Sequence, residues 1–561
     1  MSTVTLRPWQ RAAFELFRSS GEPDFLAVAT PGAGKTTFAL TCARAQLADW
    51  ARDGSARRLV VVAPTSHLKV QWSLNAHRLG LQLDPDWAPG QGLARDTHGL
   101  VTTFQQIATG PAADKLRGIA AEGMVILDEV HHAGDERAWG DGILRAFELA
   151  ARRLSLSGTP FRSDSAKIPF VRYDTTAEGE LAHADYTYGY GDALRDGGVV
   201  RPVYFPRVDG QMEWSTPSGA VLRATFGDAL ARDQVSARLR TALSLDGDWI
   251  VTVLGQAHDR LRRLRREHPD AGGLVIATDQ DHAHGIARLL RNRFDTTAEV
   301  VVSDDPTASK KIAEFSGNDR PWLVAVRMVS EGVDIPRLRV GVYATTTSTE
   351  LFFRQAVGRF VRWQSGRTTQ KAYVYVPDDP RLRHHAFQIA EARRHVLRPP
   401  GQHDGDDQDV DFDRQVHDDD RVEQLSLFSV VSSTATAVTF HAVTESVVEL
   451  FDTPDFDTEP DPPDPDFDDD PALALDLPDV PTEAGLVPWG SLSVAEQKDD
   501  LRTRNADVAK RLVDITGWNH ARVQGEMNRL AGVTSVSSAT VDQLERRLRY
   551  AESWLRRLRR G

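Results

Sequence analysis

The stretch FLAVATPGAGKTTFALTCARAQLA, residues 25–48, decides how the first part of the chain folds. An apolar run, a glycine-containing loop and a helical pattern follow one another, which predicts a strand–loop–helix unit. Gly32 and Gly34 allow backbone N–H groups to close around phosphate oxygens without a side-chain clash. Lys35 can reach the β- and γ-phosphates of a nucleotide, and Thr36 can ligate Mg²⁺. The predicted nucleotide-binding residues of this loop are Pro31, Gly32, Ala33, Gly34, Lys35, Thr36 and Thr37.

A second motif, MVILDEVHH at residues 124–132, is an apolar strand that ends in two acids. This pattern predicts that Asp128 holds Mg²⁺ and that Glu129 orients and deprotonates an attacking water. The alternative is a separate metal site on His131 and His132. Such a site needs a third ligand, which this window does not supply.

Far downstream, RQAVGRFVR at residues 354–362 places Gln355, Arg359 and Arg362 at positions i, i+4 and i+7. On a helix these three side chains would share one face. Two arginines directed across a cleft can stabilise the charge on a phosphoryl group during transfer. The alternative is a solvated basic helix face.

The wider pattern predicts an α/β fold. Between residues 1 and 395, short apolar runs alternate with helical stretches, which favours layers of helices around mostly parallel sheets. The clearest predicted strands are LVVVAPT (59–65), MVILDE (124–129), LVIATD (274–279), WLVAVR (322–327) and KAYVYVP (371–377).

Charge is distributed unevenly along the chain. Residues 401–481 contain 24 acids and two arginines, a net −22, so the whole-chain value of −13 leaves +9 for the remainder. We expect residues 399–485 to be a mostly disordered acidic linker, because apolar groups are few and like charges many. Within it, residues 424–443 could form a hairpin. The basic remainder is suited to a polyanionic partner.

Residues 486–561 predict a small, basic, all-α domain. Ser493 and Thr540 each begin a capping-box pattern. An apolar stripe follows the second of these patterns, formed by Leu544, Leu548, Ala551, Leu555 and Leu558. The interpretations are a helical bundle with a solvated basic face, an accessory nucleic-acid contact or a docking site for a partner.

Composition excludes several other chemistries. Cys42 is the only cysteine, which excludes disulfides, Cys-ligated zinc and iron–sulfur clusters within one chain. No apolar run approaches the ~18 residues that a membrane helix needs. The N-terminal residues lack the layout of a signal peptide. We therefore expect a cytoplasmic protein.

In their order and spacing, these motifs resemble those of superfamily 2 helicases and translocases of the DExH type. The phosphate loop follows the helicase pattern A-x-x-G-x-G-K-T, and Ser330 replaces another small residue in motif V. The resemblance covers about residues 1–395. It is nearest to motors on double-stranded DNA, which include restriction-enzyme translocating subunits, transcription-repair helicases and phage recombination helicases. The further matching segments are LRPWQ (6–10), APTSHLKVQW (63–72), VTTFQQ (101–106), LDEVHH (127–132, the DExH segment), SGTPFR (157–162, motif III), VRMVSEGVDIP (326–336, motif V) and QAVGRFVR (355–362, motif VI).

The resemblance implies two RecA-like domains, residues 1–165 and 201–398, which are joined by residues 166–200 and sandwich ATP with Mg²⁺. Residues 486–561 would follow as the accessory domain. The family roles fall on Gln10 as the reader of adenine, on Gly332 and Asp334 as further ATP contacts, on Arg359 and Arg362 as arginine fingers, and on His131 with motif III as the link to Gln355.

A nucleic-acid strand would lie across both domains. Its candidate contacts are Thr65, Thr103 and Gln105, each of which could instead be an ordinary cap or turn residue. The leading hypothesis is an ATP-dependent DNA helicase or translocase acting in replication, repair, recombination or phage defence. The alternatives are an RNA helicase and an ATP-gated nucleic-acid sensor without processive movement.

The pentapeptide QLSLF, residues 424–428, resembles the peptide by which bacterial polymerases and repair proteins hold the sliding clamp. Gln424 could hydrogen-bond in a polar pocket, while Leu425, Leu427 and Phe428 could fill an apolar groove. The alternative is a strand of a hairpin, or a strand packed against the second RecA-like domain.

Overall fold

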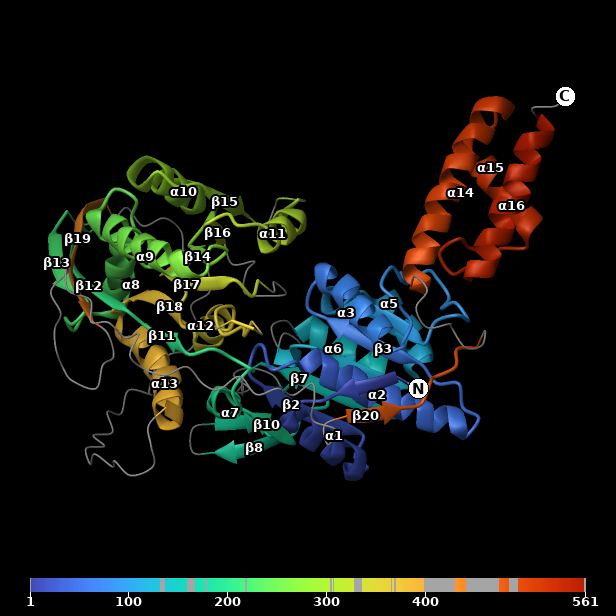
Figure 1. Ribbon diagram of the computed structural model, residues 1–561, viewed down its shortest axis with the longest axis horizontal. Coiled ribbons are helices and arrows are strands. Elements are labelled where there is room, and N and C mark those ends of the chain that lie inside the picture. The colour runs from blue at the N-terminus through green and yellow to red at the C-terminus, as the bar shows by residue number, and fades with distance from the viewer. Residues whose placement is uncertain are drawn as a thin grey trace. The chain divides into compact units, whose positions relative to one another are not determined.

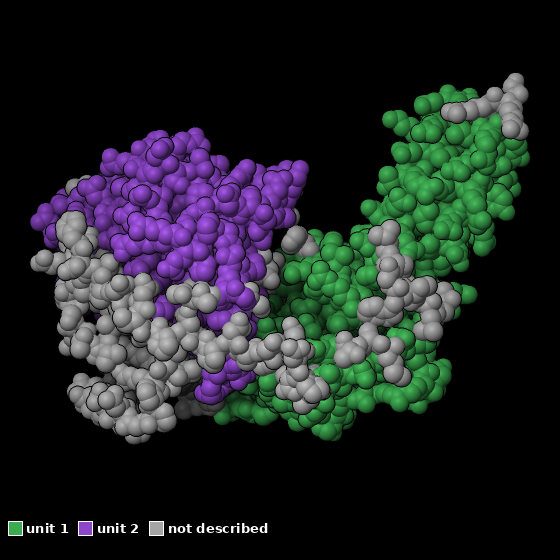
Figure 2. Space-filling view, viewed as in Figure 1, with its two compact units in different colours: residues 1–28, 34–187, 466–561 green, residues 29–33, 188–465 purple. Residues whose placement is uncertain are grey.

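The computed structural model describes residues 2–131, 137–158, 167–176, 179–216, 219–302, 305, 307–326, 335–364, 366–367, 370–397, 429–439, 474–483 and 493–558. The chain divides into two compact units (Figures 1 and 2). The first unit comprises residues 1–28, 34–187 and 466–561, and the second comprises residues 29–33 and 188–465.

The first unit is built around a seven-stranded sheet in the order β10-β2-β7-β6-β3-β5-β4. From β2 to β4, neighbouring strands run parallel, as the apolar runs predict. The strands are β10 (Tyr186–Tyr188), β2 (Asp24–Ala29), β7 (Arg152–Ser157), β6 (Met124–Leu127), β3 (Leu59–Ala63), β5 (Gly99–Thr103) and β4 (Leu83–Asp84).

Helices cover both faces of this sheet. Every residue of β3 is buried, although successive side chains of a strand point to opposite faces, so both faces must be covered. One face packs on a core that α4, α5 and α6 share with β3, β5 and β6. The helices of this part are α1 (Pro8–Ser20), α2 (Lys35–Arg52), α3 (Ser66–Arg78), α4 (Phe104–Ile107), α5 (Gly110–Ala120) and α6 (Arg137–Phe147), and a two-stranded sheet consists of β8 (Tyr173–Thr176) and β9 (Gly179–Ala182).

The second unit contains a nine-stranded sheet with the path β13-β12-β18-β17-β14-β16-β15, in which β11 also pairs with β18 and β19 with β12. Pairing is parallel from β12 through β18 to β15, and antiparallel where β13 and β19 join β12. The strands are β11 (Val203–Tyr204), β12 (Arg207–Ser215), β13 (Val221–Thr225), β14 (Gly272–Ala277), β15 (Ala298–Val301), β16 (Trp322–Val326), β17 (Leu338–Ala344), β18 (Ala372–Pro377) and β19 (Ser429–Thr439).

A second apolar core lies within this unit, between the sheet and helices that include α8, α9 and α10. The mixed α/β class predicted from the sequence is therefore confirmed in both units. The helices of the second unit are α7 (Tyr190–Asp196), α8 (Arg232–Ala242), α9 (Asp248–Glu267), α10 (Gln280–Phe294), α11 (Ala308–Ser316), α12 (Glu350–Val357) and α13 (Pro380–Leu397).

Two stretches of the predicted acidic linker are ordered strands. β19 runs antiparallel to β12 from Arg207↔Thr439 to Ser215↔Ser429, so the hairpin predicted for residues 424–443 is wrong: 429–439 is one strand, paired with a distant partner. β20 (Ala474–Leu477) pairs antiparallel with β1 (Ser2–Thr5) and returns the chain to the first unit. Residues 399–428, 440–473 and 484–485 of the predicted linker lie outside the described residues.

The C-terminal residues form a bundle of α14 (Val494–Thr516), α15 (His520–Ala531) and α16 (Val541–Leu558), which lie side by side in Figure 1. Both predicted capping boxes are confirmed. Ser493 Oγ accepts a hydrogen bond from Glu496 N–H at 3.1 Å, and Thr540 Oγ1 accepts one from Gln543 N–H at 3.2 Å. Of the predicted apolar stripe, four residues are buried in the bundle core, but Leu558 is 37% exposed at the end of α16.

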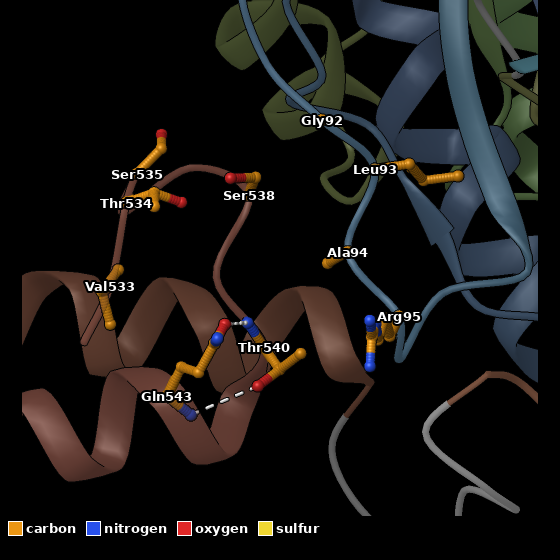
Figure 3. A pocket seen from close by; sticks show the side chains of 10 residues that line it. All are labelled: Gly92, Leu93, Ala94, Arg95, Val533, Thr534, Ser535, Ser538, Thr540 and Gln543. Carbon is orange, nitrogen blue, oxygen red and sulfur yellow. Dashed lines mark hydrogen bonds between the residues drawn. The ribbon is translucent and has the colours of Figure 1, made fainter. Parts of the chain in front are cut away.

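The bundle is attached to the α/β part of its unit by buried polar contacts. Lys498 Nζ pairs with Asp96 Oδ1 at 2.8 Å, and the other oxygen of Asp96 accepts a hydrogen bond from Val541 N–H at 3.0 Å. Beside this junction, residues 92–95 and the loop 533–540 line a small polar pocket, shown in Figure 3. One carboxylate thus fixes the start of both α14 and α16.

Among the helices that the structure describes, none is long and apolar enough to cross a membrane.

Candidate active site

The phosphate loop leaves β2 and ends where α2 begins. Gly32 and Gly34 have φ values of +85° and +93°, a region that residues with a side chain rarely adopt. Ala33 N–H donates to the carbonyl of Thr30 at 3.1 Å, which closes the turn. Gly34 is the N-cap of α2 and Lys35 its first residue. The loop therefore ends at a helix N-terminus, where N–H groups and the helix dipole favour an anion.

Gln10 supports this loop from α1. Its side chain is buried, its Nε2 donates to the carbonyl of Gly34 at 2.9 Å, and its Oε1 accepts from Arg7 N–H at 2.8 Å. A Cβ on Gly34 would lie 2.7 Å from Gln10 Nε2, so the close approach also requires glycine. The structure thus places Gln10 against the phosphate loop; its role as a reader of adenine stays a prediction.

The two acids follow directly after β6. Lys35 Nζ lies 3.1 Å from Glu129 Oε1, and Gly158 N–H donates to Glu129 Oε2 at 3.0 Å. Glu129 has a φ of +48°, an unusual value for a residue with a side chain and one that often marks a functional site. Three segments distant in sequence therefore converge on one carboxylate.

The environments of the two carboxyl groups differ. Burial raises the pKa of Asp128 to about 6, and the adjacent Glu129 charge adds to this rise. For Glu129, burial acts in the same direction, but Lys35 outweighs it with help from His131 and Gly158 N–H, so the pKa falls to about 2. Glu129 is therefore ionised near neutral pH, as a group that accepts a proton from water must be.

Trp72 was not among the predicted site residues. It lies in α3, is 2% exposed, and its Nε1–H donates to Asp128 Oδ2 at 2.9 Å. A tryptophan in a helix that follows a sheet strand gives no sequence signal of such a bond, because the bond depends on the adjacency of β3 and β6 in the sheet.

His131 lies beside the end of β7. Its Nδ1 is 3.2 Å from Ser157 Oγ and 3.8 Å from Glu129 Oε2. Because β2, β7 and β6 are neighbours in the sheet, their carboxyl ends bring together the loop, motif III and the DExH segment. This is the edge at which parallel α/β sheets bind ligands.

Mg²⁺ suits the residues present at this edge. A magnesium ion is usually bound by one or two carboxylates, with water and substrate phosphate completing the octahedron. Asp128 supplies a carboxylate whose ionised form is destabilised by burial, so a cation would stabilise it. Thr36 lies in the first turn of α2 and supplies a hydroxyl. Both remain predicted ligands.

The arginines of the second unit do not share a helix face. α12 ends at Val357 with Gly358 as its C-cap, Arg359 lies in the following turn, and Arg362 forms an isolated bridge with Val200. The predicted i, i+4, i+7 arrangement is therefore wrong beyond Gln355, which is on α12. The chain leaves the helix because Phe360 is fully buried against Gly341, where an added Cβ would lie 2.5 Å from its ring.

The candidate nucleic-acid residues have mixed surroundings. Thr103 is 6% exposed and caps α4, with its Oγ1 accepting from Gln106 N–H at 3.2 Å. Thr65 is the N-cap residue of α3 and is half-buried, and Gln105 is exposed. Thr103 is therefore an ordinary helix cap, as the alternative interpretation predicts. Gly332 and Asp334, His132 and residues 424–428 lie outside the described residues, so the clamp contact stays a prediction.

The N-terminal part of the chain matches a known family. Residues 3–162 match the family model named type III restriction enzyme, res subunit. This match agrees with the predicted resemblance to the superfamily 2 helicases and translocases over the part of the chain that holds the phosphate loop and the DExH segment.

Two mycobacterial relatives are similar over a longer range. The protein named Rv2917 of Mycobacterium tuberculosis H37Rv is 48% identical over 397 residues, and ML1624 of Mycobacterium leprae is 46% identical over the same length. Each alignment covers 70% of this chain and 65% of the relative. The chain therefore matches less than two thirds of the length of these relatives.

Solved structures give weaker similarities. A fragment assigned to the HsdR subunit of a type I restriction enzyme from Vibrio vulnificus YJ016 has a TM-score of 0.48 at 17% identity, covering 68% of this chain and 65% of that one. The S. cerevisiae protein Dbp5, bound to RNA and ADP BeF3, has a TM-score of 0.41 at 13% identity, covering 70% and 87%. Both TM-scores are below 0.5.

Proposed function

We propose that the protein is an ATP-dependent DNA helicase or translocase, in which ATP hydrolysis drives movement along DNA or its unwinding. The observation that carries this proposal is the position of Glu129, held between Lys35 of the phosphate loop and Gly158 of motif III. A carboxylate that contacts both segments can activate a water molecule. It can also transmit a change at the phosphates to motif III. The match to a restriction-enzyme family supports DNA as the polymer.

In this proposal each residue has a separate task. Lys35 and the N-terminus of α2 bind the β- and γ-phosphates, while Thr36 and Asp128 hold Mg²⁺, which would neutralise phosphate charge. Glu129 orients the attacking water and takes its proton. A bound phosphate would compete with Glu129 for Lys35, so nucleotide binding itself would release the carboxylate toward water. Arg359 and Arg362 would stabilise charge on the phosphoryl group.

The coupling path is short. Glu129, His131 and Ser157 form a chain of contacts of 3.8 Å and 3.2 Å, which joins the acid to the strand that leads into motif III. A change in the charge or position of Glu129 would therefore reach Ser157 through His131. This chain of contacts supports a motor in preference to an ATP-gated sensor, because a motor requires the hydrolysis site to be connected to motif III.

The decisive experiment measures the ATPase rate of the full chain with single-stranded, double-stranded and forked DNA, with matched RNAs and with no polymer. A rate raised at least about tenfold by DNA and less by RNA supports the proposal, while stimulation by RNA alone replaces it with the RNA helicase. A strand-displacement assay and a triplex-displacement assay on the same substrates then test movement. DNA-stimulated hydrolysis without either displacement would identify the ATP-gated sensor instead.

A further inference from the structure

The outward face of α16 carries four exposed arginines: Arg546, Arg549, Arg556 and Arg557. At 100° per residue they fall within roughly 100° of arc, opposite the stripe that faces the bundle core. The buried stripe contains Leu544, Leu548, Ala551 and Leu555, which pack on α14 and α15. The helix therefore separates an apolar inner face from an arginine-rich outer face.

These four arginines have no ion pair or hydrogen bond among the described residues. Arg547 on the inner side behaves differently, because it is 1% exposed and donates to Asn528 Oδ1 at 2.7 Å and Asn505 Oδ1 at 2.8 Å. The acids of α16 are Asp542 in its first turn and Glu545 and Glu552 toward one edge. The second half of the outer face is consequently free of carboxylates.

The same helix is fixed to the ATP-binding unit at its beginning. Asp96, which follows the pocket-lining residues 92–95, accepts the first N–H of α16 and pairs with Lys498. Asp96 and Lys498 are 8% and 4% exposed, so this contact is shielded from water and from salt. A force exerted by a ligand on the outer face of α16 would therefore be transmitted to the α/β part of the unit.

We propose that the outer face of α16 is a second nucleic-acid contact, which binds the phosphates of duplex DNA outside the motor domains. The proposal rests on the function proposed above and adds a surface to it. The first and last of the four arginines are 11 positions apart, about 16 Å along the helix, a distance over which one DNA strand presents about five phosphates. Guanidinium groups bind phosphate through paired N–H donors, and they remain charged at any physiological pH.

The test compares two full-length variants with the same charge change. The first replaces the outer-face arginines, R546Q/R549Q/R556Q/R557Q. The control, R504Q/K510Q/R511Q/R529Q, removes four exposed positive charges from α14 and α15. Binding of a labelled 30-base-pair duplex is measured by fluorescence anisotropy from about 50 to 300 mM salt, with circular dichroism to verify folding.

We expect the α16 variant to bind the duplex at least about tenfold more weakly at low salt. Its log–log salt slope should be less steep by 2 to 4, since each lost phosphate contact removes about 0.9. The control should stay within about twofold of wild type, and ATPase without DNA should be unchanged in both. Equal losses of DNA affinity in both variants would overturn the proposal. An unchanged salt slope in the α16 variant would overturn it too, because that result is expected if these arginines bind the chain's own acidic segment.

The two proposals fail in different ways. If wild-type protein neither binds DNA nor is stimulated by it, the proposed function fails and the α16 contact with it. If DNA stimulates the wild type and the α16 variant with the same half-saturating concentration, the motor stands and only the α16 contact is wrong.

Discussion

At the scale of single residues, the properties of the site depend on which groups contact each of its two carboxylates. Glu129 is contacted by Lys35 and Gly158 N–H, and Asp128 by Trp72. The two acids and the loop lysine could be identified from the sequence, because each belongs to a distinctive motif, and their chemistry stays a prediction. The contacts of Trp72 and Gly158 with these acids could not be predicted, because only the order of the strands in the sheet brings the residues together.

Glu129→Gln should reduce ATP turnover at least about 10²-fold while nucleotide and nucleic-acid binding persist. The amide cannot accept a proton from water, but it keeps the size of the side chain and an oxygen for Gly158 N–H. Steady-state ATPase and equilibrium binding of a labelled ATP analogue measure the two effects separately. The control is Glu148→Gln, an exposed acid of the same unit, which should hydrolyse ATP at the wild-type rate. Near wild-type turnover in Glu129→Gln would remove it from the catalytic role.

Trp72→Phe should raise the Mg²⁺ concentration that half-saturates the ATPase by about tenfold. The substitution removes the N–H that orients Asp128, and losing a group that orients a metal ligand typically costs 10- to 100-fold in affinity. Trp87→Phe is a matched control: Trp87 is also about 1% exposed, but its Nε1–H has no partner among the described residues. Equal Mg²⁺ curves for the two variants would show that Trp72 only packs.

At the scale of elements, the sequence pattern predicted the strands and helices whose formation depends on neighbouring residues. The parallel strands were visible as apolar runs because both of their faces are buried. The end of α12 was not visible, since the burial of Phe360 against β17 overrides the helical spacing of Arg359 and Arg362. Inside the acidic segment β20 was missed, and the position of β19 against the second unit was predicted only as an alternative to a hairpin, because the partners β1 and β12 are more than 200 residues away.

Acid should weaken the contact of His98 with Gln82 in the first unit, because protonation of Nδ1 removes the acceptor for Gln82 N–H. Its Nδ1 accepts from Gln82 N–H at 2.8 Å, and its Nε2 is 2.7 Å from the carbonyl of Val480. Burial lowers the pKa of His98 to about 4, so folding requires the neutral ring. The unfolded chain takes up a proton near pH 6.5, and stability is therefore lost progressively from about pH 6.5 down to pH 4, by about 3 kcal/mol in total.

Chemical denaturation at pH 7, 5.5 and 4.5 measures this loss, with hydrogen exchange of the Gln82 amide to locate it. His98→Gln should show a weaker dependence on pH in this window, whereas the exposed His520→Gln should keep the wild-type dependence. The assignment fails if His98→Gln and wild type lose stability in parallel.

The junction of the bundle should be sensitive to its buried ion pair. Lys498→Met leaves the carboxylate of Asp96 buried without a cation, which typically costs about 3–5 kcal/mol. The double variant Asp96→Asn/Lys498→Met should recover part of this loss, because the neutral amide can still accept from Val541 N–H. The exposed pair Arg504–Asp500 of α14 provides the control, and Arg504→Met should cost at most about 1 kcal/mol. Thermal unfolding of the four proteins gives the comparison, and equal effects at the two pairs would contradict it.

At the scale of the whole molecule, charge is separated into an acidic segment and a basic body. The net −22 of residues 401–481 is covalently tied to a body of +9, so it can compete with DNA at a high effective concentration. The presence of β19 and β20 within this segment determines how the competition is tested, because deleting the whole segment would also remove two strands.

Replacing the acids of residues 399–428 and 440–473 by Asn and Gln should tighten DNA binding, most strongly at low salt. Salt screens both the competition and the binding itself, so the two proteins should converge as salt rises. An anisotropy titration at several salt concentrations measures the difference. A variant that exchanges Asp for Glu and Glu for Asp at the same positions keeps the charge and controls for sequence alteration. Identical affinities of the neutralised variant and wild type throughout would make the segment an inert spacer.

The antiparallel pairing of β20 with β1 has a consequence for how the polypeptide can be divided. β19 belongs to the second unit and β20 to the first, so residues 440–473 connect two separately anchored strands. Behind β20, Arg44 donates to the carbonyls of Leu477 and Pro478, and Lys498 pairs with Asp96. A protease cut within 440–473 would therefore break the covalent chain but none of these contacts. The bundle would remain as a non-covalently held subunit, so the protein could be produced as two complementing polypeptides.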